Sequence, residues 1–128
     1  YVGLDITPGM ISEARKLEPE LDLRCGNILD WDDAASFDVV TANGIFYLIS
    51  DDAPGKMREI IRAMYARANE VVAFNSLSIW AADQEPGEFY ADPVQTLEFC
   101  RTLTPWVSLR HDYHSRDFTI YMYKNRHS

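Results

Sequence analysis

The chain has 128 residues and a formal net charge of −8, from 12 Lys and Arg against 20 Asp and Glu. That length predicts a single domain over residues 1–128, which can bury about two-thirds of the surface of its unfolded chain without disulfides or a metal. With 47% hydrophobic and 25% charged residues, the composition excludes a disordered chain or a collagen-like repeat, and the acidic balance argues against nucleic acid as a partner.

The first 27 residues predict a strand, a helix and a second strand. Residues 1–5 are a short apolar run that ends at Asp5, and Thr7-Pro8 is a typical helix start. Residues 21–25 form the next strand. Because the connection is too long for a hairpin, the two strands are expected to be parallel, with a right-handed crossover.

A second strand and helix follow. Residues 37–42 are almost continuously apolar, as in a parallel strand covered by helices on both faces. Residues 50–54 carry helix-start residues, and beyond them apolar side chains recur at helical spacing: Met57, Ile60, Ile61, Met64, Tyr65 and Ala68. This spacing predicts an amphipathic helix with one buried stripe.

A third buried strand is predicted over residues 71–74, ended by Asn75-Ser76. The aperiodic stretch 77–91 is expected to be a lid or binding loop, because structureless loops of this length are uncommon in compact domains. Asp92-Pro93 then opens a third helix.

The end of the chain changes character. Apolar and polar residues alternate over residues 107–113 and again over 118–123, across a short turn, which predicts an antiparallel hairpin. The fold class is therefore α/β, with a mostly parallel sheet that finishes in an antiparallel β-hairpin.

In this order the elements resemble the class I S-adenosylmethionine-dependent methyltransferases. The matching pieces are Tyr1-Val-Gly-Leu-Asp5, Met10-Ile-x-x-Ala14, Cys25-Gly-Asn-Ile28, Phe37-Asp-Val-Val, Asn43-Gly-Ile-Phe-Tyr-Leu48 and, as the last strand, Phe118-Thr-Ile-Tyr-Met-Tyr-Lys124. They extend over almost the whole chain, and their ordered spacing carries the resemblance. It implies a three-layer, Rossmann-like sheet, S-adenosyl-L-methionine as the cofactor and a methyl acceptor as the substrate.

The resemblance also implies which residues bind the adenosine part of the cofactor. Asp5 matches the acid that binds the ribose hydroxyls, and Ile6 matches the apolar residue beside the adenine. Asn27 stands where the family usually has Asp, and its carbonyl can accept from the adenine amino group in the same way. Ile28 would offer its backbone N–H to the ring. The alternatives are a helix cap at Asp5 and a simple turn at Asn27.

The methionine part of the cofactor would lie beside Asn43 and Gly44, unless Gly44 is only a turn residue. The family's first strand and Gly-rich loop, which hold the amino acid end, lie upstream of what matches Tyr1. The resemblance therefore implies an N-terminally truncated domain whose sheet lacks its middle strand. Such a chain is expected to bind the cofactor weakly. Its unpaired strand edges, at residues 1–5 and 37–42, are expected either to pair with each other or to form homo-oligomers with another copy.

Four further residues are candidates for contact with the acceptor: Asn75, Trp80, Tyr90 and His111. Trp80 and Tyr90 belong either to a lid or to a simple cover for the sheet, and His111 is either a core histidine or a base that faces the site. The pair His111-x-x-His114 has no third ligand nearby, so no metal is expected. No catalytic residue is identified, because transfer from a sulfonium needs a base only where the acceptor must lose a proton.

The sequence thus predicts methyl transfer to a small-molecule acceptor. A nicotinamide-dependent oxidoreductase is a second interpretation, and a non-catalytic fragment or interaction module is a third. No apolar run approaches the roughly 18 residues of a membrane helix, so no membrane partner is expected. Cys25 and Cys100 lack a CxxC spacing and are expected as free thiols in a reducing cytoplasm.

Overall fold

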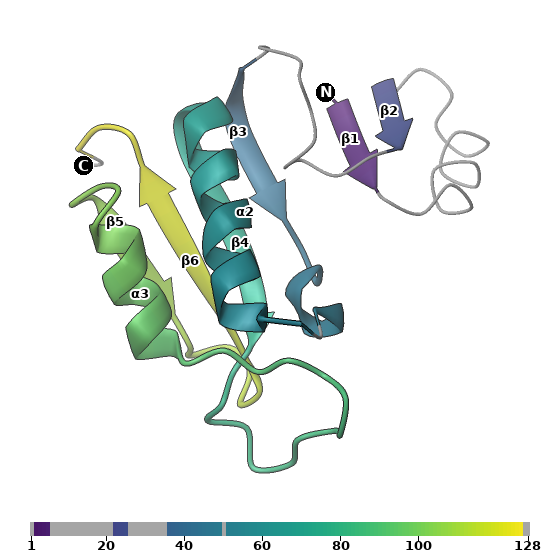
Figure 1. The fold of residues 1–128 in the computed structure, drawn as a ribbon. Helices are drawn as coiled ribbons and strands as arrows, with labels where there is room; N and C mark the ends of the chain where they lie inside the picture. The colour runs from purple at the N-terminus through teal and green to yellow at the C-terminus, as the bar shows by residue number, and fades with distance from the viewer. Residues whose placement is uncertain (1, 6–21, 26–35, 50, 127–128) are drawn as a thin grey trace. The chain divides into compact units, whose positions relative to one another are not determined.

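The computed structural model describes residues 2–5, 22–25, 36–49 and 51–126 (Figure 1). The chain forms two compact units, Tyr1–Ala34 and Ala35–Ser128, and the expectation of a single domain stays a prediction. In chain order the elements are β1 (Val2–Asp5), β2 (Asp22–Cys25), β3 (Phe37–Ala42), the short 3-10 helix η2 (Phe46–Leu48), α2 (Ala53–Arg67), β4 (Ala68–Leu77), α3 (Pro93–Arg101), β5 (Val107–Arg110) and β6 (Asp117–Tyr123).

The first unit contains the parallel pair of β1 and β2, as the sequence predicts. The strands are in register from Val2 opposite Asp22 to Asp5 opposite Cys25, so their carboxyl ends are level. The helix expected between them lies outside the described residues.

The second unit is built on a four-stranded sheet with the order β3-β4-β6-β5 (Figure 1). β3 and β4 are parallel, whereas β6 is antiparallel to both β4 and β5. This confirms an α/β fold whose sheet starts parallel and ends in an antiparallel hairpin. The last strand, β6, lies between β4 and β5, so the hairpin inserts its second strand next to the parallel pair.

Both helices of this unit cover the same face of the sheet (Figure 1). α2 contacts β3 and β4, α3 contacts β5 and β6, and the Arg62 guanidinium of α2 lies 5.4 Å from the ring centre of Phe99 on α3. The predicted apolar stripe of α2 is confirmed, because its buried side chains include Met57, Ile61 and Met64. The helix ends at Arg67, so Ala68, which was expected as the last residue of the stripe, begins β4 instead.

The helix start at Asp92-Pro93 is also confirmed. The Asp92 carboxylate accepts hydrogen bonds from the N–H groups of Val94 and Gln95, at 2.9 and 3.3 Å, which satisfies donors that the first turn leaves free. At the end of α3 the Cys100 thiol is free and fully buried, and burial raises its pKa to about 12.

The core of the second unit lies on alternate residues of its central strands. Val72 and Phe74 of β4 and Phe118, Ile120 and Met122 of β6 are each at most 1% exposed. In a strand, side chains alternate between the two faces, so these residues mark one face of the β4–β6 pair.

Two expectations about the strands are wrong in detail. Asn75 and Ser76 do not end β4, because pairing with β6 continues to Leu77 opposite Asp117. Antiparallel pairing with β6 thus keeps the chain extended past these polar residues. β3 is less buried than its apolar run predicted, with Val39 52% exposed, because α2 covers one face and β4 one edge of this strand in the described sheet.

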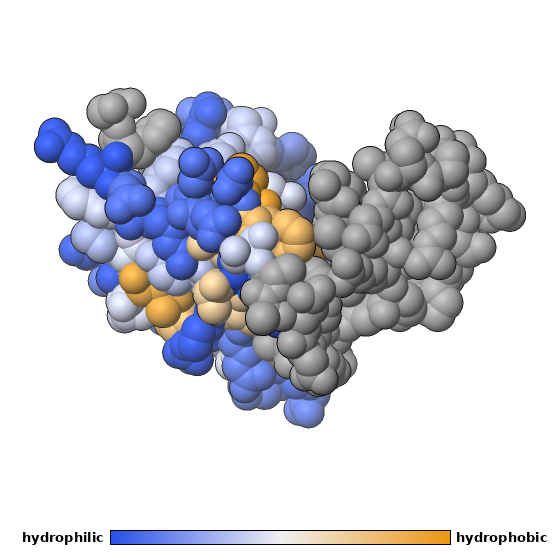
Figure 2. Space-filling view, turned by 90° about the horizontal axis from the view of Figure 1, so that it is seen from above, coloured by the Kyte–Doolittle hydropathy of each residue, from blue (hydrophilic) through white to orange (hydrophobic). Residues whose placement is uncertain are grey.

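The surface of the second unit is mostly hydrophilic where it is seen from above, with small hydrophobic areas (Figure 2). Figure 2 shows the end of the sheet that is opposite to the long loop 78–92. That loop lies below the sheet in Figure 1. Among the described residues, no helix is long and apolar enough to cross a membrane.

Candidate functional site

A hollow of about 190 Å³ lies where β3 and β4 end and β6 begins. These segments meet because the carboxyl ends of parallel strands share one edge of a sheet, and an antiparallel neighbour starts at that edge. The lining residues are Gly44, Phe46, Tyr47, Asn75, Ser76, Leu77, Glu88 and Asp117.

Asn75 links the three segments that form this hollow. Its side-chain carbonyl accepts a hydrogen bond from the Gly44 N–H at 2.7 Å, and its amide nitrogen donates to the Asp117 carboxylate at 3.5 Å. The orientation of the amide follows from these partners, since a backbone N–H can only donate and a carboxylate can only accept. The end of β3 is thereby tied to the start of β6.

Gly44 is required by its backbone conformation. Its φ is +66°, in the left-handed region, and a side chain added there would meet nothing within 4 Å. Glycine is therefore required here because the turn needs a positive φ, and not because space is short. Because its N–H is engaged by Asn75, Gly44 offers a ligand close backbone approach rather than a free donor.

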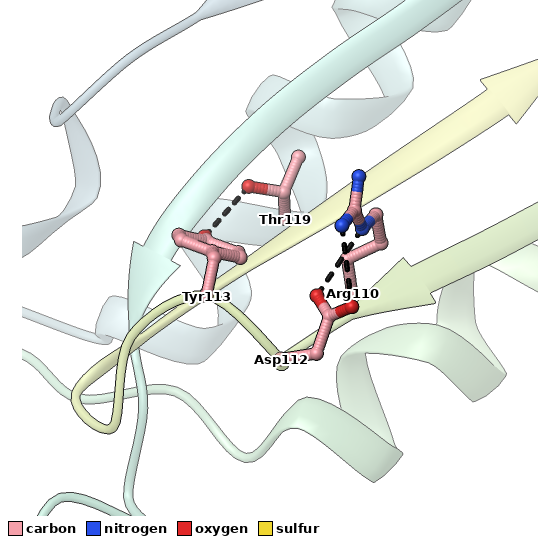
Figure 3. Close-up of polar contacts among 4 residues, drawn as sticks. All are labelled: Arg110, Asp112, Tyr113 and Thr119. Atoms are coloured by element: carbon pink, nitrogen blue, oxygen red, sulfur yellow. Dashed lines mark hydrogen bonds and ion pairs between the residues drawn. The ribbon is translucent and has the colours of Figure 1, made fainter.

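Tyr113 supports Asp117 from the β5–β6 connection. Its hydroxyl donates to the Asp117 carboxylate at 2.5 Å and lies 2.7 Å from the Thr119 hydroxyl; Figure 3 shows the contact with Thr119. Partial burial, followed by the hydrogen bond to Asp117, raises the pKa of Tyr113 to about 12. The phenol is therefore neutral near pH 7 and acts as a donor, not as a base.

Arg110 and Asp112 form an exposed ion pair beside Tyr113 (Figure 3). Two hydrogen bonds of 3.2 Å join the guanidinium to the two carboxylate oxygens. These bonds raise the pKa of Arg110 and lower that of Asp112. The Asp112 carboxylate thus neutralises the charge of Arg110.

The long loop between β4 and α3 is closed at its base by backbone hydrogen bonds. The Ala91 N–H donates to the Leu77 carbonyl at 2.8 Å, and the Ile79 N–H donates to the Ala91 carbonyl at 2.9 Å. Within the loop, the Phe89 N–H donates to the Tyr47 carbonyl at 2.9 Å. This last bond ties the loop to η2 and brings Glu88 to the hollow.

Tyr90 is buried and organises charged residues around the hollow. Its hydroxyl accepts from the Glu85 N–H at 2.7 Å and from the Arg116 guanidinium at 3.2 Å, and it donates to the Glu88 carboxylate at 3.3 Å. Tyr90 is not in the lining of either hollow, but it contacts Glu88 and Arg116, which are.

His111 is held on both ring nitrogens. Nδ1 lies 3.1 Å from the His114 carbonyl, and Nε2 lies 2.8 Å from the hydroxyl of the fully buried Ser78. Because a carbonyl only accepts, Nδ1 carries the proton and Nε2 accepts from Ser78 in the neutral ring. Trp80 stacks on the imidazole with ring centres 4.9 Å apart.

A second, more open hollow of about 420 Å³ adjoins the first. It is lined by Leu77, Tyr113, His114, Arg116 and Asp117. Leu77 and Asp117 line both hollows, so the two hollows are neighbours. The second hollow by itself lies in the size range of small-molecule sites, roughly 300–1,000 Å³.

The structure brings together only part of the predicted site. Gly44 and Asn75 line the smaller hollow, and Asn43 is exposed at the end of β3 next to it. Trp80, Tyr90 and His111 are absent from the described linings of both hollows. Their contact with an acceptor stays a prediction.

The cofactor residues of the first unit are described only in part. Asp5 ends β1, level with the end of β2, whereas Ile6, Asn27 and Ile28 lie outside the described residues. Their roles stay predictions.

Sequence reasoning missed the charged residues of the hollows: Glu88, Arg116 and Asp117. The antiparallel hairpin held a signal for Asp117, because the first residue of an antiparallel last strand lies at the carboxyl edge of its parallel neighbour. Glu88 and Arg116 had no such signal. Among the described residues, no three His, Cys, Asp or Glu side chains gather in a way that would hold a metal ion.

The profile of a family described as "Methyltransferase domain" matches residues 1–67 of this chain. None of the curated proteins matches the sequence.

Solved structures resemble the chain over nearly its whole length. The DhpI–SAH complex has a TM-score of 0.67 at 16% identity and covers 94% of this chain and 63% of its own. Magnesium protoporphyrin IX methyltransferase (ChlM) from Synechocystis PCC 6803 with bound SAH has a TM-score of 0.70 at 6% identity, with 97% and 64% covered. The N-methyltransferase NodS from Bradyrhizobium japonicum WM9 has a TM-score of 0.65 at 16% identity, with 98% and 73% covered.

The chain spans less than two-thirds of the length of the first two of these proteins. At such low identities, the likeness shows a shared fold.

Proposed function

This chain belongs to the methyltransferase family whose profile matches its first 67 residues, and on that premise we propose that it takes part in methyl transfer from S-adenosylmethionine to a small-molecule acceptor. The evidence for a binding site for the methyl acceptor is the pair of neighbouring hollows at the carboxyl edge of the β3–β4 sheet. In open sheets with parallel strands, ligands bind at this edge. Several of the similar solved structures are complexes with SAH or SAM, which supports this cofactor.

The position of Asp5 supports a role of the first unit in binding the adenosine part of this cofactor. The register of β1 and β2 places Asp5 at the carboxyl edge of a parallel pair, where an acid can accept hydrogen bonds from both ribose hydroxyls. Ile6, Asn27 and Ile28 would bind the adenine. In the second unit, Asn43 and Gly44 would lie beside the methionine part.

When bound, S-adenosylmethionine supplies a methyl group on a good, neutral leaving group. The chain then has to align the acceptor and exclude water. Asn75 and Tyr113 hold the Asp117 carboxylate in place at the junction of the two hollows, where it can accept a hydrogen bond from an acceptor N–H or O–H. We assign Asp117 this orienting role.

The proposal includes a cytoplasmic location, which the buried free thiol of Cys100 supports. Self-association through strand edges, and the absence of nucleic acid and membrane partners, stay predictions.

Replacement of Asp5 tests the cofactor assignment. Since a hydrogen bond to a charged group contributes roughly 1.5–3 kcal/mol, Asp5→Ala should weaken binding of S-adenosylhomocysteine about tenfold or more in calorimetry. Asp22→Ala is the matched control, because Asp22 begins β2 at the opposite edge of the same strand pair. Equal affinities for Asp5→Ala and the unaltered protein would contradict the assignment.

A further inference from the structure

Arg116 is the cation of the larger hollow, and its backbone is anchored on both sides. Its carbonyl accepts from the Ser78 N–H at 2.9 Å, and its N–H donates to the His114 ring at 3.0 Å. The side chain therefore leaves the β5–β6 connection from a fixed point at the edge of the hollow.

The guanidinium of Arg116 is incompletely satisfied within the described part of the chain. Nη2 donates to the Tyr90 hydroxyl at 3.2 Å, whereas Nε is buried and has no hydrogen-bond partner. No carboxylate of the described residues forms an ion pair with it. The guanidinium therefore carries a charge beside the larger hollow that no described carboxylate neutralises, although its buried Nε is not itself open to a ligand there.

Arg110, the last residue of β5, shows what a satisfied arginine next to this connection looks like. It is exposed, and both oxygens of Asp112 accept from it at 3.2 Å. The two arginines lie six positions apart, yet only Arg116 lines a hollow and lacks an anion among the described residues.

We propose that Arg116 binds an anionic oxyacid group, a carboxylate or a phosphate, on the methyl acceptor. Such groups match the planar fork of a guanidinium. This inference rests on the proposed function and names the substrate class of the same site. Because Arg116 lines the larger hollow, the acidic end of the acceptor would lie there and the reacting end in the neighbouring smaller hollow.

Asp117 limits where the anion can lie. Its carboxylate lines the larger hollow too, and like charges repel. The hydrogen bonds from Tyr113 and Asn75 converge on one of its oxygens, Oδ2, and hold the group toward β4 and Thr119. The acidic end of the acceptor is therefore expected on the Arg116 side, and Asp117→Asn should strengthen its binding.

The test uses three probes that share a phenyl ring: benzoate, phenyl phosphate and the neutral benzamide. NMR of the 15N-labelled protein follows the Arg116 Nε–H signal, which is assigned by its loss in Arg116→Gln. We expect at least one anion to shift this signal while benzamide does not, and the tighter anion to identify the group. Arg116→Gln should weaken that anion about tenfold or more, and Arg110→Gln should leave it unchanged.

Three results would overturn the inference: equal binding of benzamide and the anions, equal weakening by Arg110→Gln and Arg116→Gln, or no shift of the Arg116 signal by either anion. If Arg116→Gln fails to fold, Arg116→Lys keeps the charge without the fork and should bind the anion more weakly than the unaltered protein. The shift in the unaltered protein needs no variant beyond the assignment.

Titration with S-adenosylhomocysteine separates the two proposals. A protein that binds this compound but neither anion refutes the Arg116 inference alone. A protein that binds an anion through Arg116 but shows not even weak binding of this compound supports the anion site and contradicts the proposed cofactor binding by this chain.

Discussion

The two faces of the β4–β6 strand pair are built from alternate residues of the same ten-residue and seven-residue segments. One face carries Phe74, Phe118 and Ile120, each at most 1% exposed. The other carries Asn75 and Asp117, which are partly exposed and joined by a hydrogen bond. Apolar burial stabilises the first face, and directional polar contacts hold the second.

The difference separates stability from function. The hydrophobic effect is nondirectional, so the buried face does not select a ligand. Because the interior is closely packed, a loss of side-chain volume on this face lowers the stability of the fold. Hydrogen bonds on the other face contribute little net stability each, but they fix where charges lie. Substitutions on the two faces should therefore produce different kinds of damage.

The largest effect is expected from Ile120→Ala on the buried face. Removal of a fully buried isoleucine side chain leaves a cavity and should lower the free energy of unfolding by about 2–5 kcal/mol. Ile79→Ala is the matched control, because Ile79 is 42% exposed and its loss should change stability by about 0.5 kcal/mol or less. Urea unfolding followed by circular dichroism measures both, and equal losses would break the comparison.

The next largest effect on stability is expected from the titration of the Cys100 thiol at alkaline pH. Its pKa is raised from 9.0 to about 12 in the folded chain. Above pH 9 the unfolded chain loses this proton while the folded chain keeps it, so stability present below pH 9 is lost as the pH rises toward 12. The loss approaches about 1.4 kcal/mol per pH unit.

The stability difference between the unaltered protein and Cys100→Ala should therefore shrink between pH 8 and pH 10, as measured by urea unfolding at each pH. A difference that stays constant over this range would show that the thiol is not shielded as its burial requires.

The smallest stability effect is expected on the polar face. Asn75→Ala removes the acceptor of the Gly44 N–H and should cost about 0.5–1.5 kcal/mol. It should also weaken binding of S-adenosylhomocysteine, because Gly44 is then no longer held at the hollow. Asn69→Ala is the control at the other end of β4, where the exposed side chain makes one hydrogen bond of 3.3 Å, to Asp38. Equal effects of the two variants on binding would contradict the assignment of Gly44.

Much of the fold was predictable from local patterns. The stripe of α2, the capped start of α3 and the alternation of β6 each rest on side-chain periodicity or on a cap, which neighbouring residues decide. The match of the ordered strand ends to the methyltransferase family followed from the same local pieces, and the family profile bears it out.

The site was predictable only where a strand visibly ends. Asn43-Gly44 follows β3 directly, and the positive φ of Gly44 explains the residue type. Asn75 was expected past the end of a strand, but it lies within β4, because pairing with β6 over a long sequence separation continues the strand.

By itself, the sequence determined the fold class, the capped start of α3 and the buried stripe of α2, because capping and periodicity act over a few residues. Tertiary structure alone decided that β6 lies beside β4, and therefore that Asp117 meets Asn75 from 42 residues away. It also decided that Asp112 neutralises Arg110, whereas Arg116 turns to Tyr90 and leaves its Nε without an acceptor among the described residues. Such contacts depend on which distant segments pack side by side, and local sequence patterns do not specify this packing.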